Sequence, residues 1–409
     1  MKWVGLLAAL AFLTLVGMSR GEQAEEPWAI IISGDTAGYL SPCGCTKPMT
    51  GGIRRRATAI NQFRQGEKTL VLDTGQISGG AGRQHEIKAE TVAEILGRLK
   101  VDAMNLTRED VQAGLGNLAA LQRLSGDAFV SANVPDPGLG GYLFAKSKVP
   151  FLISGIDPRL GPYESKVKEF VNEAQISKTV PILMTTGDEK HARELAEKFN
   201  GLRLIIYRST SQVSDQPIQI GYTTLVSPGE KGKAVIKLSW TGSGFSGYVA
   251  NHLSEEVPND PAAQESFSTY LSRVKAEKLL DMKPRTSHDA FAGSKACQSC
   301  HQREYDIWAH SKHAEALKTL EKDGHDFDPD CVSCHVVGLD STKGFKSRDL
   351  TPLLTDVGCE SCHGPATEHV MKPKKHPLPK AGEKSCSSCH NLEHSPTFDF
   401  VDYWRKIKH

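Results

Sequence analysis

The sequence predicts two domains of different fold classes: an α/β layered domain over residues 25–250 and a mainly α-helical and irregular domain over residues 291–409. In the first segment, short apolar runs alternate with runs whose apolar residues recur at helical spacing, which is typical of layered α/β domains. The second segment holds four cysteine–histidine motifs, with about thirty residues for each. So few residues cannot build a conventional core, so bound cofactors must supply much of the buried apolar surface.

Eight apolar segments of the first domain are predicted to be strands, because they are short and are bounded by turn residues. They are residues 28–33, 69–73, 128–133, 151–154, 180–184, 202–207, 222–226 and 233–240. Helices are predicted at residues 52–63, 86–99, 117–124 and 189–199, and the run Arg54-Arg55-Arg56 is expected on a solvated helix face. A connector over residues 251–290 should contain one helix, which begins at Asp260-Pro261 and runs to about Leu280.

Four Cys-x-x-Cys-His motifs dominate the second domain. The spacing is the attachment signature of c-type haem, because two thiols can reach the vinyl groups of one porphyrin edge while the next His binds the iron. The predicted attachment and proximal residues are Cys297, Cys300, His301, Cys331, Cys334, His335, Cys359, Cys362, His363, Cys386, Cys389 and His390. A zinc ribbon does not need a His after every second Cys, and a dithiol oxidoreductase needs one motif. The sequence therefore predicts four covalently bound haem c groups.

The N-terminus predicts export. Lys2 is followed by an apolar run from Val4 to Val16 and then by small and polar residues, which is the pattern of a signal peptide over residues 1–24. No Cys follows to carry a lipid anchor, and no later segment reads as transmembrane. Because c-type haem is attached outside the bacterial cytoplasmic membrane, we expect a periplasmic protein, with the cell surface as the alternative. Lys and Arg (49) nearly balance Asp and Glu (48), and no polybasic run indicates nucleic acid.

Two cysteines lie outside the haem motifs, Cys43 and Cys45. A disulfide between residues only two apart would be strained. A structural turn and a reactive or metal-binding pair remain the two interpretations.

The first domain resembles the periplasmic metallophosphatase and 5′-nucleotidase superfamily over most of residues 28–245. The segment Gly34-Asp35-Thr36-Ala37-Gly38 stands at that family's Asp-x-His metal motif, and Asp73-Thr74-Gly75-Gln76 stands at its Asp-x-x-Asp motif. Asn105-Leu106 stands at Asn-His, while Thr185-Thr186 and residues 207–210 stand where later metal-binding histidines occur. The resemblance implies that family's layered fold.

The departures from the metallophosphatase pattern argue against its chemistry. Ala37, Gln76, Leu106 and the regions of Thr185 and Arg208 offer neither imidazole nor carboxylate. A two-metal site needs a bridging carboxylate and several nitrogen ligands, which two carboxylates and an amide cannot supply. The sequence thus predicts a phosphatase-like scaffold without phosphatase activity.

Residues 293–365 resemble the cytochrome c-554 family of tetrahaem electron carriers, which includes the acceptor for hydroxylamine oxidoreductase. The similarity lies in Lys295–His301, Ser311–Ala314, Asp330–Val336, Thr351–Thr355 and Val357–Pro365.

That resemblance also implies ligands on the far side of each iron. It implies that His313 caps the third haem, that His369 caps the first, and that the haem on His335 has an open or weakly held sixth position. The fourth haem would be capped from the C-terminal tail, by His394 or His409. His310 and His313 are expected on one helix after the first motif, where the Ser-x-His-Ala context favours His313. The remaining histidines, His288, His325 and His376 among them, exceed what four irons require.

The sequence therefore predicts a periplasmic multihaem cytochrome c that carries electrons between a donor and an acceptor protein. No residue is assigned as catalytic, and electron transfer is favoured over catalysis. The first alternative is a multihaem oxidoreductase that acts on a small nitrogen compound at a five-coordinate haem. The second is a haem-regulated phosphoesterase that uses Asp35, Asp73 and Asn105.

Overall fold

The computed structural model describes residues 27–42, 48–66, 68–134, 144–209, 213–391 and 394–409. The predicted signal peptide and the Cys43 and Cys45 pair lie outside these residues. Within the described ranges, no helix has both the length and the apolar character needed to cross a membrane.

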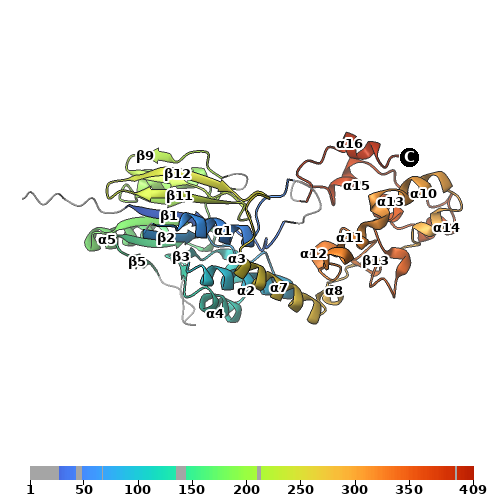
Figure 1. The fold of residues 1–409 in the computed structure, drawn as a ribbon, viewed down its shortest axis with the longest axis horizontal. Helices are drawn as coiled ribbons and strands as arrows, with labels where there is room; N and C mark the ends of the chain where they lie inside the picture. The colour runs from blue at the N-terminus through green and yellow to red at the C-terminus, as the bar shows by residue number, and fades with distance from the viewer. Residues whose placement is uncertain (1–26, 43–47, 67, 135–143, 210–212, 392–393) are drawn as a thin grey trace, which may run out of the picture.

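The N-terminal half contains two stacked six-stranded sheets (Figure 1). The first sheet has the order β12 (Phe245–His252), β11 (Ala234–Trp240), β1 (Trp28–Ser33), β2 (Lys68–Asp73), β3 (Ala103–Asn105) and β4 (Phe129–Val130). The second has the order β5 (Lys146–Lys148), β6 (Phe151–Ile156), β7 (Val180–Thr185), β8 (Leu204–Ile206), β10 (Thr223–Val226) and β9 (Ile218–Ile220). β1 to β4 are parallel, as are β6, β7, β8 and β10, so their carboxyl ends share one edge of each sheet.

The alternation of side chains along β1 and β2 explains the layers. Ile30 and Ile32 point into the core between the sheets, whereas Ile31 packs on the outer core under the helices, as the two-residue period of a strand requires. Helices α1 (Ile53–Phe63), α2 (Arg83–Arg98), α4 (Leu115–Leu124) and α7 (Pro261–Ala276) cover the first sheet. Helices α5 (Glu164–Ser177) and α6 (Glu189–Lys198) cover the second. The predicted α/β layered class is confirmed.

The helix expected in the connector is α7, which Asp260 caps by accepting a hydrogen bond from the Ala263 amide at 2.9 Å. It ends at Ala276, and the short helix α8 (Leu279–Met282) follows. Phe267, Tyr270 and Val274 are buried in the same core as α1 and α2. The helix is thus part of the wall of the N-terminal half.

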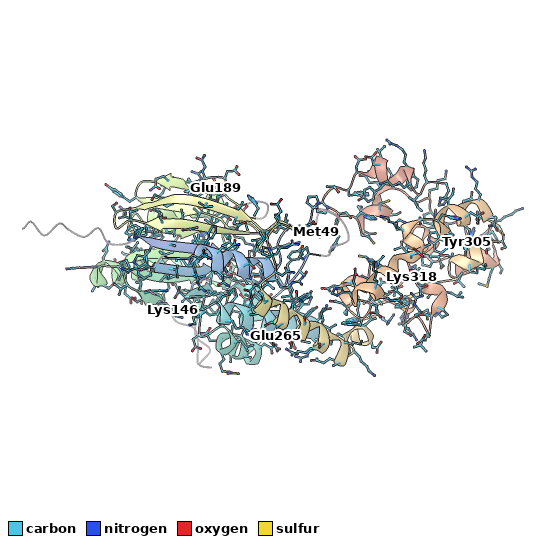
Figure 2. The ribbon with its side chains drawn as sticks, in the orientation of Figure 1. Met49, Lys146, Glu189, Glu265, Tyr305 and Lys318 are labelled. Atoms are coloured by element: carbon cyan, nitrogen blue, oxygen red, sulfur yellow. The ribbon has the colours of Figure 1, made fainter. Side chains whose placement is uncertain are left out.

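The C-terminal half consists of short helices and long loops, as predicted (Figure 2 labels Tyr305 and Lys318 in it, and Glu265 of α7). Its elements are β13 (Ser287–Ala290), α9 (Ser294–Cys297), α10 (Gln302–Ala309), η2 (Lys312–Glu315), α11 (Ala316–Asp323), α12 (Pro329–Val332), β14 (Ser341–Lys343), η3 (Pro352–Leu354), α13 (Cys359–His363), α14 (Thr367–Met371), α15 (Glu383–Ser387) and α16 (Phe400–Arg405). Among its described residues, one small apolar cluster forms around Leu317, Val332 and Phe345.

The two halves meet where α12 contacts α2 and α7. Asp328 accepts hydrogen bonds from Gln84 Nε2 at 2.7 Å and from the Tyr270 hydroxyl at 3.3 Å. Lys88 forms an ion pair with Asp330. Because Cys331 lies on α12, these contacts hold the second haem motif directly against the N-terminal half.

Candidate haem-binding sites and a remnant metal site

Each haem motif begins on a short helix: α9, α12 and α15 end within their motifs, whereas α13 spans the whole of the third motif. In the first and fourth motifs, the amide of the His donates to the carbonyl of the first Cys, at 2.9 Å for His301 and 2.8 Å for His390. All eight motif cysteines are free thiols. The geometry therefore leaves both sulfurs of each motif available for thioether bonds.

Three pairs of histidine rings face each other in the C-terminal half. The ring centroids of His301 and His369 are 6.4 Å apart, those of His313 and His390 are 6.2 Å apart, and those of His363 and His409 are 5.8 Å apart. One metal ion bound by two imidazole nitrogens at about 2 Å each would separate two ring centroids by about 6 Å. The spacing thus fits one iron between the members of each pair.

Hydrogen bonds at the other ring nitrogen suit the same role. The Nδ1 atoms of His335, His363 and His369 lie 2.6, 3.0 and 2.8 Å from the backbone carbonyls of Ala316, Pro379 and His376. The Nδ1 atoms of His390 and His409 lie 2.9 Å from the Ser395 hydroxyl and 3.0 Å from the Ile407 carbonyl. A proton held on Nδ1 leaves the Nε2 lone pair free for a metal, which is the usual arrangement of ligating histidines.

Burial favours the neutral form of two of these rings. It lowers the pKa of His313, to which the neighbouring His390 also contributes, and it lowers the pKa of His390. An imidazole must be neutral to bind iron, so desolvation works in favour of ligation.

The pairing differs from the implied one when the motifs are counted along the chain. His369 lies opposite His301 of the first motif, as implied, but His313 lies opposite His390 of the fourth motif. His409, one of the two candidates in the tail, lies opposite His363 of the third motif. Among the described residues, no histidine ring forms such a pair with His335.

The expected helix containing both His310 and His313 is wrong. α10 ends at Ala309, the exposed His310 turns its Nδ1 to the Asp306 carbonyl at 2.7 Å, and His313 lies on the separate turn η2. Where the helix ends, the Ser311 hydroxyl donates to the Trp308 carbonyl at 2.6 Å. The two histidines therefore do not share one helix face.

Contacts between thiols give the motifs a spatial order. The Cys359 side chain raises the pKa of the Cys297 thiol, and the Cys389 side chain raises the pKa of the Cys334 thiol, so the members of each pair are neighbours. Burial, and then the neighbouring Cys386, raise the pKa of Cys362, which places the third motif beside the fourth. The sequence of neighbours is thus first, third, fourth, second.

Glu360, in the third motif, is a residue that the sequence analysis missed. Its buried carboxylate accepts backbone hydrogen bonds from Ala292 at 2.9 Å, Gly293 at 2.7 Å and Ala366 at 2.7 Å. The Cys359 amide in turn donates to the Ser294 hydroxyl at 3.0 Å. These bonds clamp the first motif to the third, and only the position of Glu360 between the two cysteines could have hinted at them.

In the N-terminal half, arginines pair with the two carboxylates that stand at the metallophosphatase motif positions, Asp73 and Asp35. Asp73 accepts from the Ser33 hydroxyl at 2.8 Å and lies 3.4 Å from Arg56 Nη1, while Arg56 Nη2 donates to the Thr36 hydroxyl at 2.9 Å. Arg56 is only 1% exposed, so its expected place on a solvated helix face is wrong. Its guanidinium supplies the positive charge that the buried Asp73 needs.

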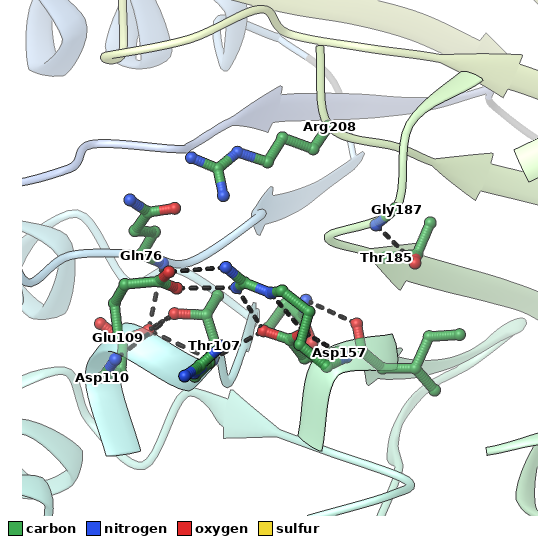
Figure 3. Close-up of polar contacts among 12 residues, drawn as sticks. Gln76, Thr107, Glu109, Asp110, Asp157, Thr185, Gly187 and Arg208 are labelled. Carbon is green, nitrogen blue, oxygen red and sulfur yellow. Dashed lines mark hydrogen bonds and ion pairs between the residues drawn. The ribbon is translucent and has the colours of Figure 1, made fainter. Parts of the chain in front are cut away.

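A second arginine pairs with the other carboxylate. Arg208 Nε donates to Asp35 at 3.2 Å, and burial raises the pKa of Asp35 to about 6 although Arg208 pulls it down. Arg208 faces Gln76 across this end of the domain, with Thr185 and Asp157 nearby (Figure 3). Leu106 is fully buried in the outer core, and Asn105 Nδ2 donates to the Ile156 carbonyl at 3.2 Å.

The residues of this remnant do not form a metal site. In the part of the chain that the structure describes, no group of three or more His, Cys, Asp or Glu side chains could hold a metal ion. Thr185 uses its hydroxyl to accept the Gly187 amide at 3.0 Å. The positions thus keep local structural roles in place of metal ligation.

The C-terminal part is similar to known cytochromes. Residues 296–364 match the family model of cytochrome c554 and c-prime. The chain is 34% identical over 141 residues to cytochrome c-554 of Nitrosomonas europaea, which covers 26% of this chain and 60% of that relative. The chain thus spans about 60% of the length of this curated relative. The similarity supports a multihaem cytochrome c with covalently bound haem.

The N-terminal half shares its fold with nucleotidases. The NAD nucleotidase of Haemophilus influenzae superposes with a TM-score of 0.54 at 14% identity, over 66% of this chain and 64% of that chain. The 5′-nucleotidase precursor of Thermus thermophilus superposes with a TM-score of 0.52 at 17% identity, over 73% of this chain and 68% of that chain. At these identities the likeness concerns the fold alone, and it confirms the resemblance found in the sequence.

We predict that Arg56→Met lowers the free energy of unfolding by about 3–5 kcal/mol, because it leaves the buried Asp73 carboxylate without its counter-charge. Thermal and denaturant unfolding of the full chain would measure the loss. Arg123→Met removes an exposed arginine of α4 and should change the stability by less than about 0.5 kcal/mol.

Elemental analysis of the wild type should find no pair of bound zinc, manganese or non-haem iron ions; such a pair would contradict the account of the remnant.

Proposed function

We propose that this chain is a periplasmic tetrahaem cytochrome c that passes electrons between a donor and an acceptor protein. The three facing histidine pairs carry the proposal, because two imidazoles on one iron leave no position for a substrate. When bound, each haem supplies a one-electron redox centre. The protein's part is to fix the axial ligands, to hold the motifs close together and to keep water from the irons.

The spacing of the motifs supports a continuous electron path. Neighbouring thiols join the first motif to the third, the third to the fourth and the fourth to the second. Glu360 and Ser294 hold the first step of that series together through three backbone hydrogen bonds between the segments of the first and third motifs. In this proposal the N-terminal half is a positioning module, which holds the second motif through Asp328 and Asp330.

The proposal predicts that mass spectrometry of the mature protein finds four covalently bound haems. Cys300→Ala should remove one thioether bond and weaken retention of the haem on His301, because one sulfur then remains to hold it. The same variant should leave the other three haems in place. A wild-type mass that corresponds to three haems or fewer would exclude the tetrahaem assignment.

A second candidate function follows from His335. Since no described histidine faces it, its haem would be five-coordinate and could bind a small nitrogen compound. Electron paramagnetic resonance of the oxidised protein should then count three low-spin haems and one high-spin haem. For an electron carrier, nitrite and hydroxylamine should leave the high-spin signal unchanged and should not be turned over. A shift of that signal together with turnover would favour the oxidoreductase.

The ligand assignments predict different outcomes for two nearby histidines. His313→Ala should gain a high-spin signal equal to one haem, because His390 would lose the ring that faces it. His310→Ala should leave the spectrum nearly unchanged, because the His310 ring is exposed and bonds to its own helix. Electron paramagnetic resonance of the two oxidised variants makes the comparison. The reverse pattern would show that His310 is the ligand and would leave the haem number intact.

A further inference from the structure

The two ends of the motif series differ in charge and in accessibility. Near the second motif, four aspartates fall within residues 323–330. The N-terminal half already contacts this end, through Lys88 on Asp330 and through Gln84 and Tyr270 on Asp328. A partner protein therefore finds the acidic end partly occupied by the chain's own first half.

The opposite end carries a lysine-rich loop between α14 and α15. α14 lies at the end of the C-terminal half remote from the N-terminal half (Figure 1). Residues 370–382 contain four lysines and no carboxylate, and a fifth lysine follows; the five are Lys372, Lys374, Lys375, Lys380 and Lys384. All five are exposed. The nearest carboxylates in the sequence are Glu368, which lies 3.1 Å from the His376 ring, and Glu383.

The same loop is bonded to the ligands of two different haems. The His376 carbonyl accepts from His369 Nδ1 at 2.8 Å, and the Pro379 carbonyl accepts from His363 Nδ1 at 3.0 Å. The two histidines serve the first and third motifs. A protein resting on this loop is therefore one hydrogen bond away from two axial ligands.

Two apolar side chains begin the loop. Val370 is 43% exposed and Met371 is 68% exposed, and they lie directly before the lysines. An apolar contact beside a ring of charges is the usual composition of a docking surface, because the charges guide encounter and the apolar centre excludes water. The loop lacks the aromatic residues that anchor proteins in a membrane interface, which favours a protein partner over a lipid surface.

We propose that residues 370–384, the lysine loop, are the surface on which an acidic redox protein docks to exchange electrons with the haems of the first and third motifs. This inference rests on the proposed function. Complementary charge at such a surface raises the association rate by about 10- to 1,000-fold, and salt screens the effect. The second haem, beneath the N-terminal half, then lies at the far end of the path.

The test uses the full haem-loaded chain and, as the probe, a reduced acidic [2Fe–2S] ferredoxin. The loop variant is Lys374→Glu/Lys375→Glu/Lys380→Glu. The matched control is Lys322→Glu/Lys343→Glu/Lys346→Glu, which changes the net charge equally at three exposed lysines of the same half. Stopped-flow absorbance measures the bimolecular rate constant from about 20 to about 300 mM ionic strength. The neutral semiquinone of 5-deazariboflavin, a strong reductant generated by a light flash, is the second reductant, and binding to anionic lipid vesicles is measured in parallel.

We expect the wild-type rate with ferredoxin to fall as salt rises. At low salt the loop variant should be at least about tenfold slower and should lose most of the salt dependence, whereas the control should change by less than about threefold. Reduction by the deazariboflavin semiquinone should be equal in all three proteins. If both variants lost the same fraction of the rate with ferredoxin, net charge alone would explain the effect and the proposal would be overturned. An unchanged rate in the loop variant would also overturn it. Loss of vesicle binding without loss of ferredoxin reduction would assign the loop to a membrane surface. If the deazariboflavin semiquinone reduces no haem in the wild type, the proposed function itself fails.

Discussion

In the proposed cytochrome, the pairing of histidines across an iron is the constraint on which the C-terminal half depends. Apart from the small cluster around Leu317 and Phe345, its described residues bury few apolar side chains, and its helices are mostly one or two turns long. Helices of that length are unstable alone. Bonds from the first motif to His369, from the third to His409 and from the fourth to His313 would join segments far apart in the sequence. Metal ligation and folding are thus coupled, as in other small domains built around a cofactor.

The N-terminal half differs from the C-terminal half in that its own side chains balance its buried charges. Its layered core is extensive, so it does not need a metal to fold, but it retains Asp35 and Asp73 at the ends of parallel strands. Buried carboxylates without cations are costly. Arg56 and Arg208 supply that charge from within the chain. A guanidinium is covalently attached to the protein, so it balances each carboxylate without a removable ion.

The sequence could predict the features that neighbouring residues specify. It could not predict the contacts between residues that lie far apart in the chain. The strand at residues 28–33 and the haem motifs are specified by neighbouring residues, and β1 matches its predicted range. β12 was missed because its residues are intermediate or exposed, so none of its positions is fully buried. α5 was missed although its buried residues, Val167, Phe170, Val171 and Ala174, recur at helical spacing. The histidine pairs join residues up to 77 positions apart, as in His313 and His390, so no local pattern could assign them. The burial of Arg56 likewise depends on Asp73 and Thr36 approaching from other segments.

The contact between the halves makes the two ends of the C-terminal half different, because it covers one end and leaves the other open. Tyr270 and Gln84 belong to helices of the layered domain, and both donate to Asp328, which also caps the helix carrying Cys331. Among the described residues, His335 has no second histidine ring opposite it, and its motif is the one that the N-terminal half holds. The lysine loop is instead bonded to His363 and His369, each of which lies opposite another histidine. A free cytochrome would expose both ends to any partner of suitable charge. The layered domain at the acidic end limits access there and leaves the basic end open, so under the proposed function it would influence electron transfer by steric and electrostatic means.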